Sequence, residues 1–300
     1  MSCKNCIEKP VIIFTTNKIK LCKSCFFKYF ERKVLKTIRV NRLFEKKDKI
    51  LVACSGGKDS TTILDLLNKF AKARKLMPVE AMTIDLHIGD YTKKNIENIT
   101  KFCKENKIKL HKIDFRKKFG YSVCYLKSIL ISKGLKLNSC TICGVLRRYL
   151  INKEARKLKA TKVVTGHNLD DEAQNILMNQ FKGGLSFSAK LGPITGIKTD
   201  PKFIQRVKPL YFCTDTELTL YSKLKKFPVM YKKCPCVVGS YRDNVRKMLN
   251  KFEKEFSAAQ RLSPFAACKE RLYYGKSHKA KAHKLPDPLI LRSTFRYFGP

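Results

Sequence analysis

The sequence has no apolar run of the roughly 18–20 residues that a helix needs to cross a bilayer. Near its N-terminus, Cys3 and Cys6 stand where a secretory signal would need an apolar stretch. Internal repeats and low-complexity tracts are also absent. We therefore expect an intracellular, cytoplasmic protein that does not associate with membranes. Its 300 residues suffice for one large domain, or for a main domain with one or two small ones.

Acidic residues are scarce. The chain has 64 Lys and Arg but only 24 Asp and Glu, which gives a formal net charge of +40. Charge of this size governs solubility and non-specific binding and says little about fold. Nucleic acid is the natural polyanionic partner for such a chain. A solvated lysine-rich surface is the alternative interpretation, and the two are compatible.

The chain contains thirteen cysteines. In an intracellular protein they indicate metal binding in preference to disulfides. Two Cys-x-x-Cys pairs, Cys3 with Cys6 and Cys22 with Cys25, are separated by fifteen residues. This spacing predicts a four-thiolate zinc module over residues 1–30, which is too small to fold without its metal. Four reduced cysteines on an unstructured tail are the alternative.

A glycine-containing turn joins the apolar run 50–54 to a second apolar run at 63–67. This strand, turn and helix start would aim backbone N–H groups at one point, where Lys58 adds a full charge. Adjacent glycines and an acid after the lysine distinguish the turn from the Walker loop. The turn resembles the PP-loop of the N-type ATP pyrophosphatases, although an ordinary capped turn is the alternative. The predicted phosphate-binding residues are Ser55, Gly56, Gly57, Lys58, Asp59 and Ser60.

Beyond residue 49, apolar runs and helical patterns alternate. This predicts an α/β fold with a doubly wound parallel sheet. Ligands of such sheets bind beyond the carboxyl ends of the strands, where Ser55, Asp85 and His167 are expected. A basic amphipathic helix over about 26–48 precedes the sheet, and residues 183–242 show no clear period. Strands are predicted at 50–54, 79–86, 109–114 and 161–166. Helices are predicted at about 59–75, 93–106, 144–158, 171–182 and 243–256.

A second cysteine set consists of Cys140 and Cys143, at the start of a predicted helix, and the distant Cys234. Three thiolates on a cubane cluster leave one iron without a protein ligand, and an open position is what chemistry requires. A second zinc site and a redox or persulfide pair are the alternatives. Cys236 is close in sequence and is held as an alternate ligand.

Together these motifs resemble the tRNA 2-thiouridine synthetase family over residues 1 to about 256. The resemblance implies an adenine-nucleotide alpha-hydrolase-like fold of the PP-loop type. It divides the chain into a zinc-binding module at 1–30, a linker helix at 31–48, a catalytic domain at 49–256 and an atypical basic tail at 257–300. The matching pieces are the paired N-terminal knuckles, Ser55–Ser60, Ile84–Leu86, Cys140 with Cys143, Gly166–Asp171, and Cys234 with Tyr241–Arg242.

The resemblance also implies roles for individual residues. Asp85 would line the adenosine side of an ATP site, and Arg147 would meet a phosphate. Gly166, His167 and Asp170 would close this site. Asp59 and Asp171 are assigned to catalysis. Asp170 or Asp171 would aid catalysis or bind Mg²⁺, and helix capping is the alternative role for Asp170 and Asp171. Cys140, Cys143 and Cys234 would hold a [4Fe-4S] cluster.

The implied reaction is adenylation of the C2 oxygen of a tRNA uridine by ATP, with the wobble uridine as the expected target. Attack by sulfur held on the cluster then gives 2-thiouridine. The implied cofactors are ATP, Mg²⁺, [4Fe-4S] and Zn²⁺. The partners are tRNA, a homodimer mate and a sulfur donor, either inorganic sulfide or a ubiquitin-like thiocarboxylate protein. A tRNA 2-thiocytidine synthetase, a lysidine synthetase and a non-catalytic zinc-ribbon nucleic-acid-binding protein are the alternatives.

Two features depart from the family. Only Cys268 remains after residue 236, so the second four-cysteine module of the family cannot form. His87 stands where relatives tend to have glycine.

Overall fold

The computed structural model describes residues 2–14, 18–74, 77–135, 138–196, 200 and 202–255. The basic tail predicted at 257–300 lies outside the described residues. Within the described ranges, no helix combines the length and the apolar character that crossing a membrane demands.

A six-stranded sheet forms the centre of the molecule, in the order β5-β4-β3-β6-β8-β7. Every pair of neighbours is parallel except β7 and β8, which are antiparallel. This confirms the predicted parallel α/β fold, and the four predicted strands all form. The strands are β3 (Ile50–Ala53), β4 (Glu80–Asp85), β5 (Leu110–Asp114), β6 (Lys162–Thr165), β7 (Ile194–Thr195) and β8 (Gln205–Val207).

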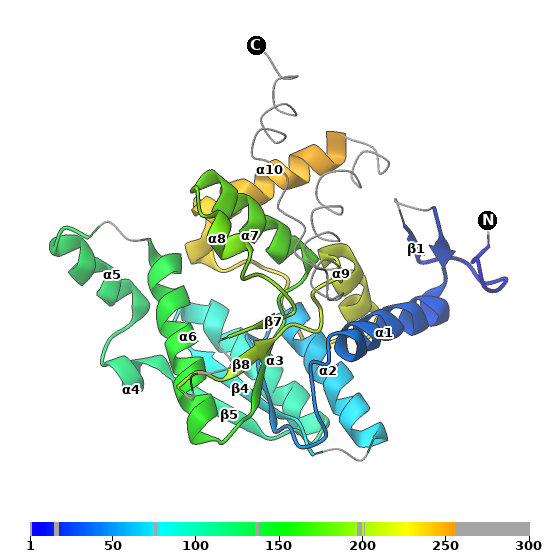
Figure 1. Cartoon of the computed structure of the whole chain (residues 1–300), viewed down its shortest axis with the longest axis horizontal. Helices are drawn as coiled ribbons and strands as arrows, with labels where there is room; N and C mark the ends of the chain where they lie inside the picture. Colours follow the sequence, from blue (N-terminus) through cyan, green and yellow to red (C-terminus); the bar gives the residue numbers. More distant parts are fainter. Residues whose placement is uncertain are drawn as a thin grey trace, which may run out of the picture. The chain divides into compact units, whose positions relative to one another are not determined.

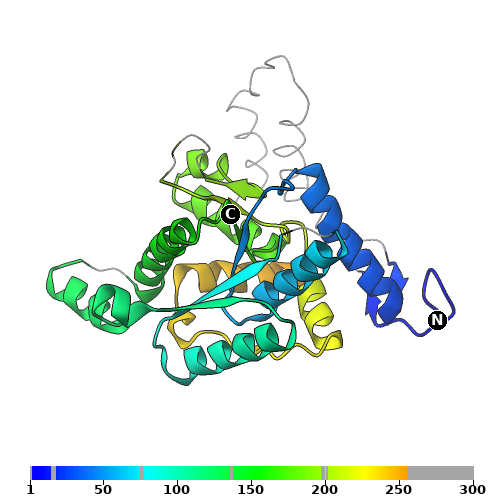
Figure 2. The same ribbon diagram turned by 90° about the horizontal axis from the view of Figure 1, so that it is seen from below.

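Helices cover both faces of this sheet (Figures 1 and 2). Successive strand residues point to opposite faces, so Val52 and Val164 enter one core while Leu51 and Val163 enter the other. The first core is covered by α1 (Lys23–Val40), α2 (Lys58–Ala73), α3 (Gly89–Glu105) and α9 (Asp215–Leu224). The second is covered by α4 (Phe115–Phe119), α5 (Val123–Ser132) and α6 (Ser139–Lys157). The remaining helices are α7 (Leu169–Phe181), α8 (Leu185–Ser188), the 3-10 turn η1 (Pro235–Val237) and α10 (Tyr241–Glu255).

The strand order reverses beside β3. The chain runs from β3 outward through β4 to β5 and then returns to β6 on the other side of β3. In doubly wound sheets, such a reversal opens a crevice at the carboxyl ends of the strands. The turn after β3 and the turn after β6 both face this crevice, and the predicted PP-loop is the first of them.

The N-terminal hairpin leads directly into α1. Strands β1 (Ile12–Ile13) and β2 (Lys20–Leu21) pair in antiparallel orientation. The helix begins earlier than the predicted 26–48, because Cys22 caps it: Cys22 Sγ accepts a hydrogen bond from the Cys25 backbone N–H at 3.5 Å. It also ends earlier, at Val40, and Arg42 beyond it adopts a positive φ of 47°.

Helix α1 is fixed to α9 by two polar contacts. Lys33 Nζ lies 2.7 Å from Glu217 Oε1, and the Tyr221 hydroxyl donates to Glu31 Oε1 at 2.7 Å. The ring of Phe30 packs on Tyr221 with centroids 4.6 Å apart. The helix that follows the cysteine module is therefore part of the main core.

Candidate functional site

Two glycines allow other elements to approach the predicted PP-loop closely. Gly56 has a φ of +79°, and a Cβ atom there would lie 2.3 Å from the Asn95 carbonyl oxygen on α3. A Cβ atom on Gly166, at the end of β6, would lie 2.8 Å from the Ser60 backbone nitrogen. Any larger side chain at these positions would displace the loop.

The start of α2 presents backbone amides toward the crevice. Gly57 occupies the N-cap position, and it has no side chain that could bond the first-turn N–H groups. Those groups and the helix dipole form an anion site. Inside the loop, Ser60 Oγ accepts from the Ser55 N–H at 3.2 Å and donates to the Gly57 carbonyl at 3.1 Å. Ser55 itself is exposed.

Acidic side chains surround Lys58. Its Nζ lies 2.8 Å from Asp59 Oδ1 and 2.6 Å from Asp215 Oδ1. Asp170 Oδ2 in turn accepts the Asp215 backbone N–H at 2.7 Å. Desolvation raises the pKa of Asp59 to about 6, although the Lys58 charge opposes this rise. The loop lysine is thus neutralised by carboxylates contributed by α2 and α9.

Sequence reasoning missed Asp215. It lies in the segment 183–242, which has no clear period. A signal was available: Thr214 and Glu217 have the spacing of a capping box, and they form one in the structure. The sequence could therefore have placed an acidic helix start here. It could not have shown that this helix start meets Lys58, which is 157 residues away.

Asp171 takes part in helix capping. Asn168 Oδ1 accepts the Asp171 N–H at 3.0 Å, and Asp171 Oδ2 accepts the Asn168 N–H at 3.2 Å. The other carboxylate oxygen lies 3.6 Å from Arg242 Nη1 on α10. His167, just before the cap, has its Nδ1 2.9 Å from Thr165 Oγ1. Helix capping, the alternative role for this acid, therefore accounts for the contact of Oδ2 but not for that of Oδ1.

His87 joins the ends of β4 and β5. Its backbone N–H donates to Asp85 Oδ1 at 2.9 Å, and its Nε2 lies 2.9 Å from Asp114 Oδ1. Its φ is +54°, in the left-handed region that glycine adopts without strain. Its contacts with the two carboxylates tie the ends of β4 and β5 together. Asp85 is engaged here beside the pocket described next.

One pocket of about 210 Å³ joins the PP-loop to the second cysteine set. Ser55 and the ends of β3 and β4 line one side of it. Cysteines from α6 and η1 line the other. Tyr91 of α3 also lines the pocket; it was not predicted, since nothing in the sequence distinguishes it from a core tyrosine. The polar and thiol residues of the lining are Cys54, Ser55, Tyr91, Thr92, Asn95, Ser139, Cys140, Cys143, Arg147, Cys234 and Cys236.

The pocket thiols come from two segments that meet. Cys140 Sγ donates to the Cys236 carbonyl oxygen at 3.1 Å, which ties α6 to η1. Burial raises the pKa of the Cys143 thiol, and the neighbouring Arg147 guanidinium partly offsets this rise. Burial also raises the pKa of Cys140, with smaller contributions from Cys143 and Cys236. Cys213 is buried in the core and is absent from the lining of this pocket.

The geometry separates two kinds of thiol group. Among the residues that the structure describes, the four N-terminal cysteines are the only group of three or more possible metal ligands whose ligand atoms all lie within 4.8 Å of one another. Cys140, Cys143 and Cys234 share a pocket without converging on one point. A cubane cluster spaces its thiolates more widely than a single ion does, so the pocket set suits a cluster better than zinc.

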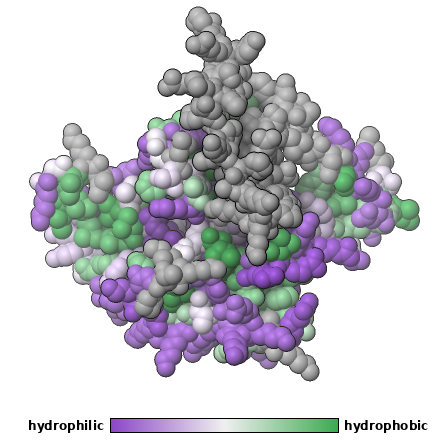
Figure 3. Space-filling view, viewed as in Figure 1, coloured by the Kyte–Doolittle hydropathy of each residue, from purple (hydrophilic) through white to green (hydrophobic). Residues whose placement is uncertain are grey.

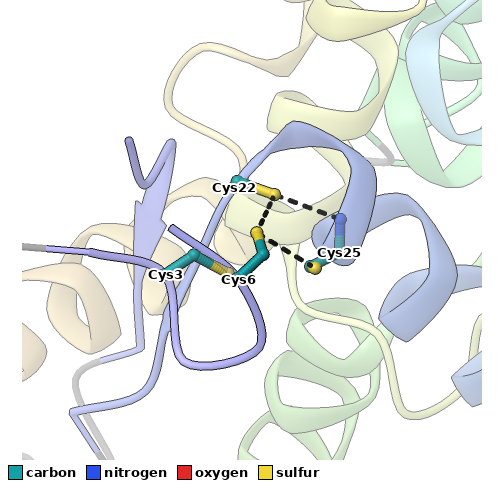
Figure 4. A group of neighbouring side chains, drawn as sticks. All are labelled: Cys3, Cys6, Cys22 and Cys25. Atoms are coloured by element: carbon teal, nitrogen blue, oxygen red, sulfur yellow. Dashed lines mark hydrogen bonds between the residues drawn. The ribbon is translucent and has the colours of Figure 1, made fainter. Parts of the chain in front are cut away.

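The four N-terminal sulfur atoms fit a zinc ion (Figure 4). Cys6 Sγ lies 3.5 Å from Cys22 Sγ and 3.9 Å from Cys25 Sγ. A tetrahedral site with Zn–S bonds of about 2.3 Å has sulfur–sulfur edges of ~3.8 Å. Cys3 completes the group. The predicted four-cysteine module is therefore present, with donor atoms spaced for a metal.

Fold and site together define a PP-loop protein, and comparisons with known proteins agree. Residues 28–234 match the family described as "PP-loop domain". The chain is 34% identical over 255 residues to the tRNA-5-methyluridine(54) 2-sulfurtransferase of Pyrococcus horikoshii, covering 85% of this chain and 78% of that protein. It is 32% identical over 258 residues to cytoplasmic tRNA 2-thiolation protein 1 of Drosophila willistoni, covering 84% and 73%.

A solved structure gives the same result. The U34-tRNA thiolase NcsA from Methanococcus maripaludis, determined with its [4Fe-4S] cluster, superposes with a TM-score of 0.75 at 28% identity. The match covers 95% of this chain and 92% of that one. The chain belongs to the PP-loop family of tRNA 2-thiolation enzymes, the tRNA 2-sulfurtransferases. The resemblance predicted from the motifs is confirmed.

Proposed function

We propose that this protein is an ATP-dependent tRNA-uridine 2-sulfurtransferase that converts a uridine to 2-thiouridine and releases AMP and pyrophosphate. The observation that carries the proposal is that Ser55 of the PP-loop lines the same pocket as Cys140, Cys143 and Cys234. An activated base bound there would lie between the nucleotide and the sulfur. The wobble uridine is the proposed target, because the U34-tRNA thiolase matches nearly the whole chain.

The first chemical step is activation of the uracil. The C2 oxygen is a poor leaving group, so it attacks the α-phosphorus of ATP and the bond to pyrophosphate breaks. The first-turn amides of α2 and the charge of Lys58 would stabilise the departing pyrophosphate. Lys58 must exchange Asp215 and Asp59 for phosphate oxygens in this step. Asp59, Asp171 and Asp215 are the carboxylates that would hold Mg²⁺, which prefers such ligands and neutralises phosphate charge.

The second step is transfer of sulfur. Cys140, Cys143 and Cys234 would hold a [4Fe-4S] centre, which would supply a place to bind the sulfur in reactive form. The pocket would then position the adenylated base beside that sulfur. Holding the two reactants together raises their effective concentration and so speeds the reaction. The sulfur electron pair forms the new bond to C2, and the C2–O bond breaks as AMP leaves with the oxygen. Arg147, beside Cys143, is placed to meet the leaving phosphate.

The remaining components of the proposal follow from the charge and the family. Lys and Arg side chains would bind the tRNA backbone, and the base must be unstacked to reach the pocket. Zn²⁺ would occupy the N-terminal cysteines. The sulfur donor would be inorganic sulfide or a ubiquitin-like thiocarboxylate protein. We also propose a cytoplasmic homodimer.

Anaerobic reconstitution tests the proposal. The protein is loaded with iron and sulfide and incubated with ATP, Mg²⁺, sulfide and unmodified tRNA, and nucleosides are identified by mass spectrometry. We expect 2-thiouridine and stoichiometric AMP, both abolished in Lys58→Ala and retained in the matched surface variant Lys36→Ala. A tRNA with cytidine at position 34 should not react, whereas one changed at position 54 should. Formation of 2-thiocytidine, or no tRNA-dependent AMP from cluster-loaded protein, would contradict the proposal.

A further inference from the structure

Five cysteines line the pocket, and one of them, Cys54, is buried at the end of β3 with its thiol directed to the Ser60 carbonyl oxygen at 4.0 Å. The other four give one thiol more than a three-thiolate cluster site requires. Cys234 and Cys236 flank Pro235 in η1, and both line the pocket together with Cys140 and Cys143. The fixed φ of Pro235 limits how far this short turn can rearrange. Cys236 is partly exposed, so it can reach both the pocket and solvent.

Contacts place Cys236 among the other three thiols. Its carbonyl oxygen accepts the Cys140 thiol at 3.1 Å. Cys236 lines the same pocket as Cys234, two residues before it in the chain. A negative charge on the Cys236 thiolate would raise the pKa of both the Cys140 and the Cys143 thiol. Cys236 is therefore the residue of η1 that neighbours every member of the predicted cluster set.

We propose that Cys236 is an exchangeable fourth ligand of the iron–sulfur centre in this pocket. It binds the iron that Cys140, Cys143 and Cys234 leave open, and it gives way to incoming sulfide. This inference rests on the proposed function. A thiol held this close to an iron without a protein ligand would coordinate it, because thiolate is the ligand that iron–sulfur centres prefer.

The exchange is balanced without a change of oxidation state. Hydrogen sulfide brings one sulfur and two protons. Its sulfur forms the new bond to iron, the bond from iron to the Cys236 sulfur breaks, and one proton passes to the released Cys236 thiolate. The resting centre would thus be closed by four thiolates, and it would open only when its sulfur substrate is present.

Oxidative loss of iron distinguishes a closed centre from an open one. The full chain is reconstituted without air, brief oxidation is applied, and iron content and electron paramagnetic resonance are measured. We expect wild type to keep all its iron, while Cys236→Ser binds the same cluster but loses one iron of the four, with a three-iron signal. Cys236→Ala should lose the same iron as Cys236→Ser, and this agreement would exclude an effect of the serine hydroxyl. Sulfide added to wild type should make its oxidation resemble that of Cys236→Ser.

Two controls fix the interpretation. Cys124→Ser changes an exposed thiol outside the pocket lining and should match wild type. Cys143→Ser removes a permanent ligand and should lower total iron binding before any oxidation. Equal iron loss by wild type and both Cys236 variants would overturn the proposal. So would complete failure of those variants to bind a cluster while folded by circular dichroism, because Cys236 would then be a permanent ligand.

The proposed function fails in a different way. None of these measurements uses tRNA, so equal iron loss together with continued formation of 2-thiouridine rejects only the role of Cys236. Absence of 2-thiouridine from wild type with an intact cluster rejects the proposed function.

Discussion

At the scale of single residues, the shape of the PP-loop depends on two glycines, because neither has a side chain to block the close approach of other elements. Gly56 leaves room for the Asn95 carbonyl, and Gly166 leaves room for the Ser60 amide. The two contacts bring α3 and β6 against the loop. Packing against α3 and β6 therefore fixes the backbone conformation at the start of α2 in the absence of phosphate.

Gly166→Ala should weaken ATP binding. The added methyl would lie 2.8 Å from the Ser60 nitrogen, so either the β6 turn or the loop must move. We expect at least a tenfold loss of affinity, about 1.4 kcal/mol, measured by calorimetry with a non-hydrolysable ATP analogue. Gly192→Ala is the matched control, because its new atom would make only an ordinary contact at 3.7 Å. Equal affinities for both variants would refute the packing argument.

Mg²⁺–ATP binding should depend on pH through Asp59. Its pKa is raised to about 6, so the carboxylate is charged above that value and takes up a proton as pH falls through it. A protonated carboxyl group is a poor ligand for Mg²⁺. We expect affinity to fall on acidification from about pH 7.5 to about pH 5. Asp59→Asn should bind Mg²⁺–ATP weakly and without this pH dependence. If the variant kept the wild-type pH profile, a group other than Asp59 would be responsible for it.

At the scale of secondary structure elements, a half-buried ion pair joins α1 to α9. Glu217 is nearly buried and also caps α9, so removing Lys33 would leave a charge without its cation. We expect Lys33→Met to destabilise the protein by about 3 kcal/mol, measured by urea denaturation. Lys36→Met, on the exposed side of the same helix, should change little. Similar midpoints for the two variants would show that the pair contributes nothing to stability.

The start of α1 should depend on zinc. Cys22 both caps the helix and belongs to the four-sulfur group, so loss of the metal would loosen the first turn. We expect Cys6→Ser to lose the zinc measured by mass spectrometry and to exchange the backbone amides of Cys25 and Phe26 faster. Cys124→Ser should do neither. If Cys6→Ser still bound one zinc per chain, the zinc would be bound somewhere other than these four cysteines.

The sequence predicted the long elements but missed the short ones. β3, β4 and β6 contain apolar stretches between helical patterns, which local composition identifies. β5 has only Leu110 and Ile113 as apolar residues, and the alternation of strands with helices predicts it. β7 and β8 have two and three residues, which is too short for a period to be seen. Helices α4 and α5 were missed as well. Most residues of α5 are apolar, Ile131 within it and Leu135 after it are exposed, and hydrophobic surface gathers over this part of the molecule in Figure 3. Without a polar face, the helical period is hidden.

The same division applies to the site. Residues in motifs, such as Lys58 and Cys140, could be proposed as site residues from the sequence because their local spacing marks them. Asp215 and Tyr91 reach the site only through packing of α9 and α3, which no local pattern encodes. The cluster role assigned to Cys140, Cys143 and Cys234 stays a prediction.

At the scale of the whole molecule, the charge of +40 should dominate the affinity for tRNA. We expect binding to fall by a factor of ~10³ or more between about 50 and about 200 mM salt, as counterions return to the backbone. Residues 258–300 hold nine Lys and Arg against two acids, so deleting them leaves +33. The truncated chain should keep most of the salt dependence in filter-binding assays. A flat salt response after truncation would place tRNA binding in the tail.

The path from the N-terminal cysteines to the nucleotide loop is short. Cys22 starts α1, α1 holds Glu217 and Tyr221 of α9, and α9 begins at Asp215, which contacts Lys58. Loss of a metal from the four cysteines would thus alter the surroundings of Lys58 in the proposed ATP site, although the two sites share no atom. If the metal is zinc and the proposed function holds, a shortage of zinc would lower the 2-thiolation of tRNA.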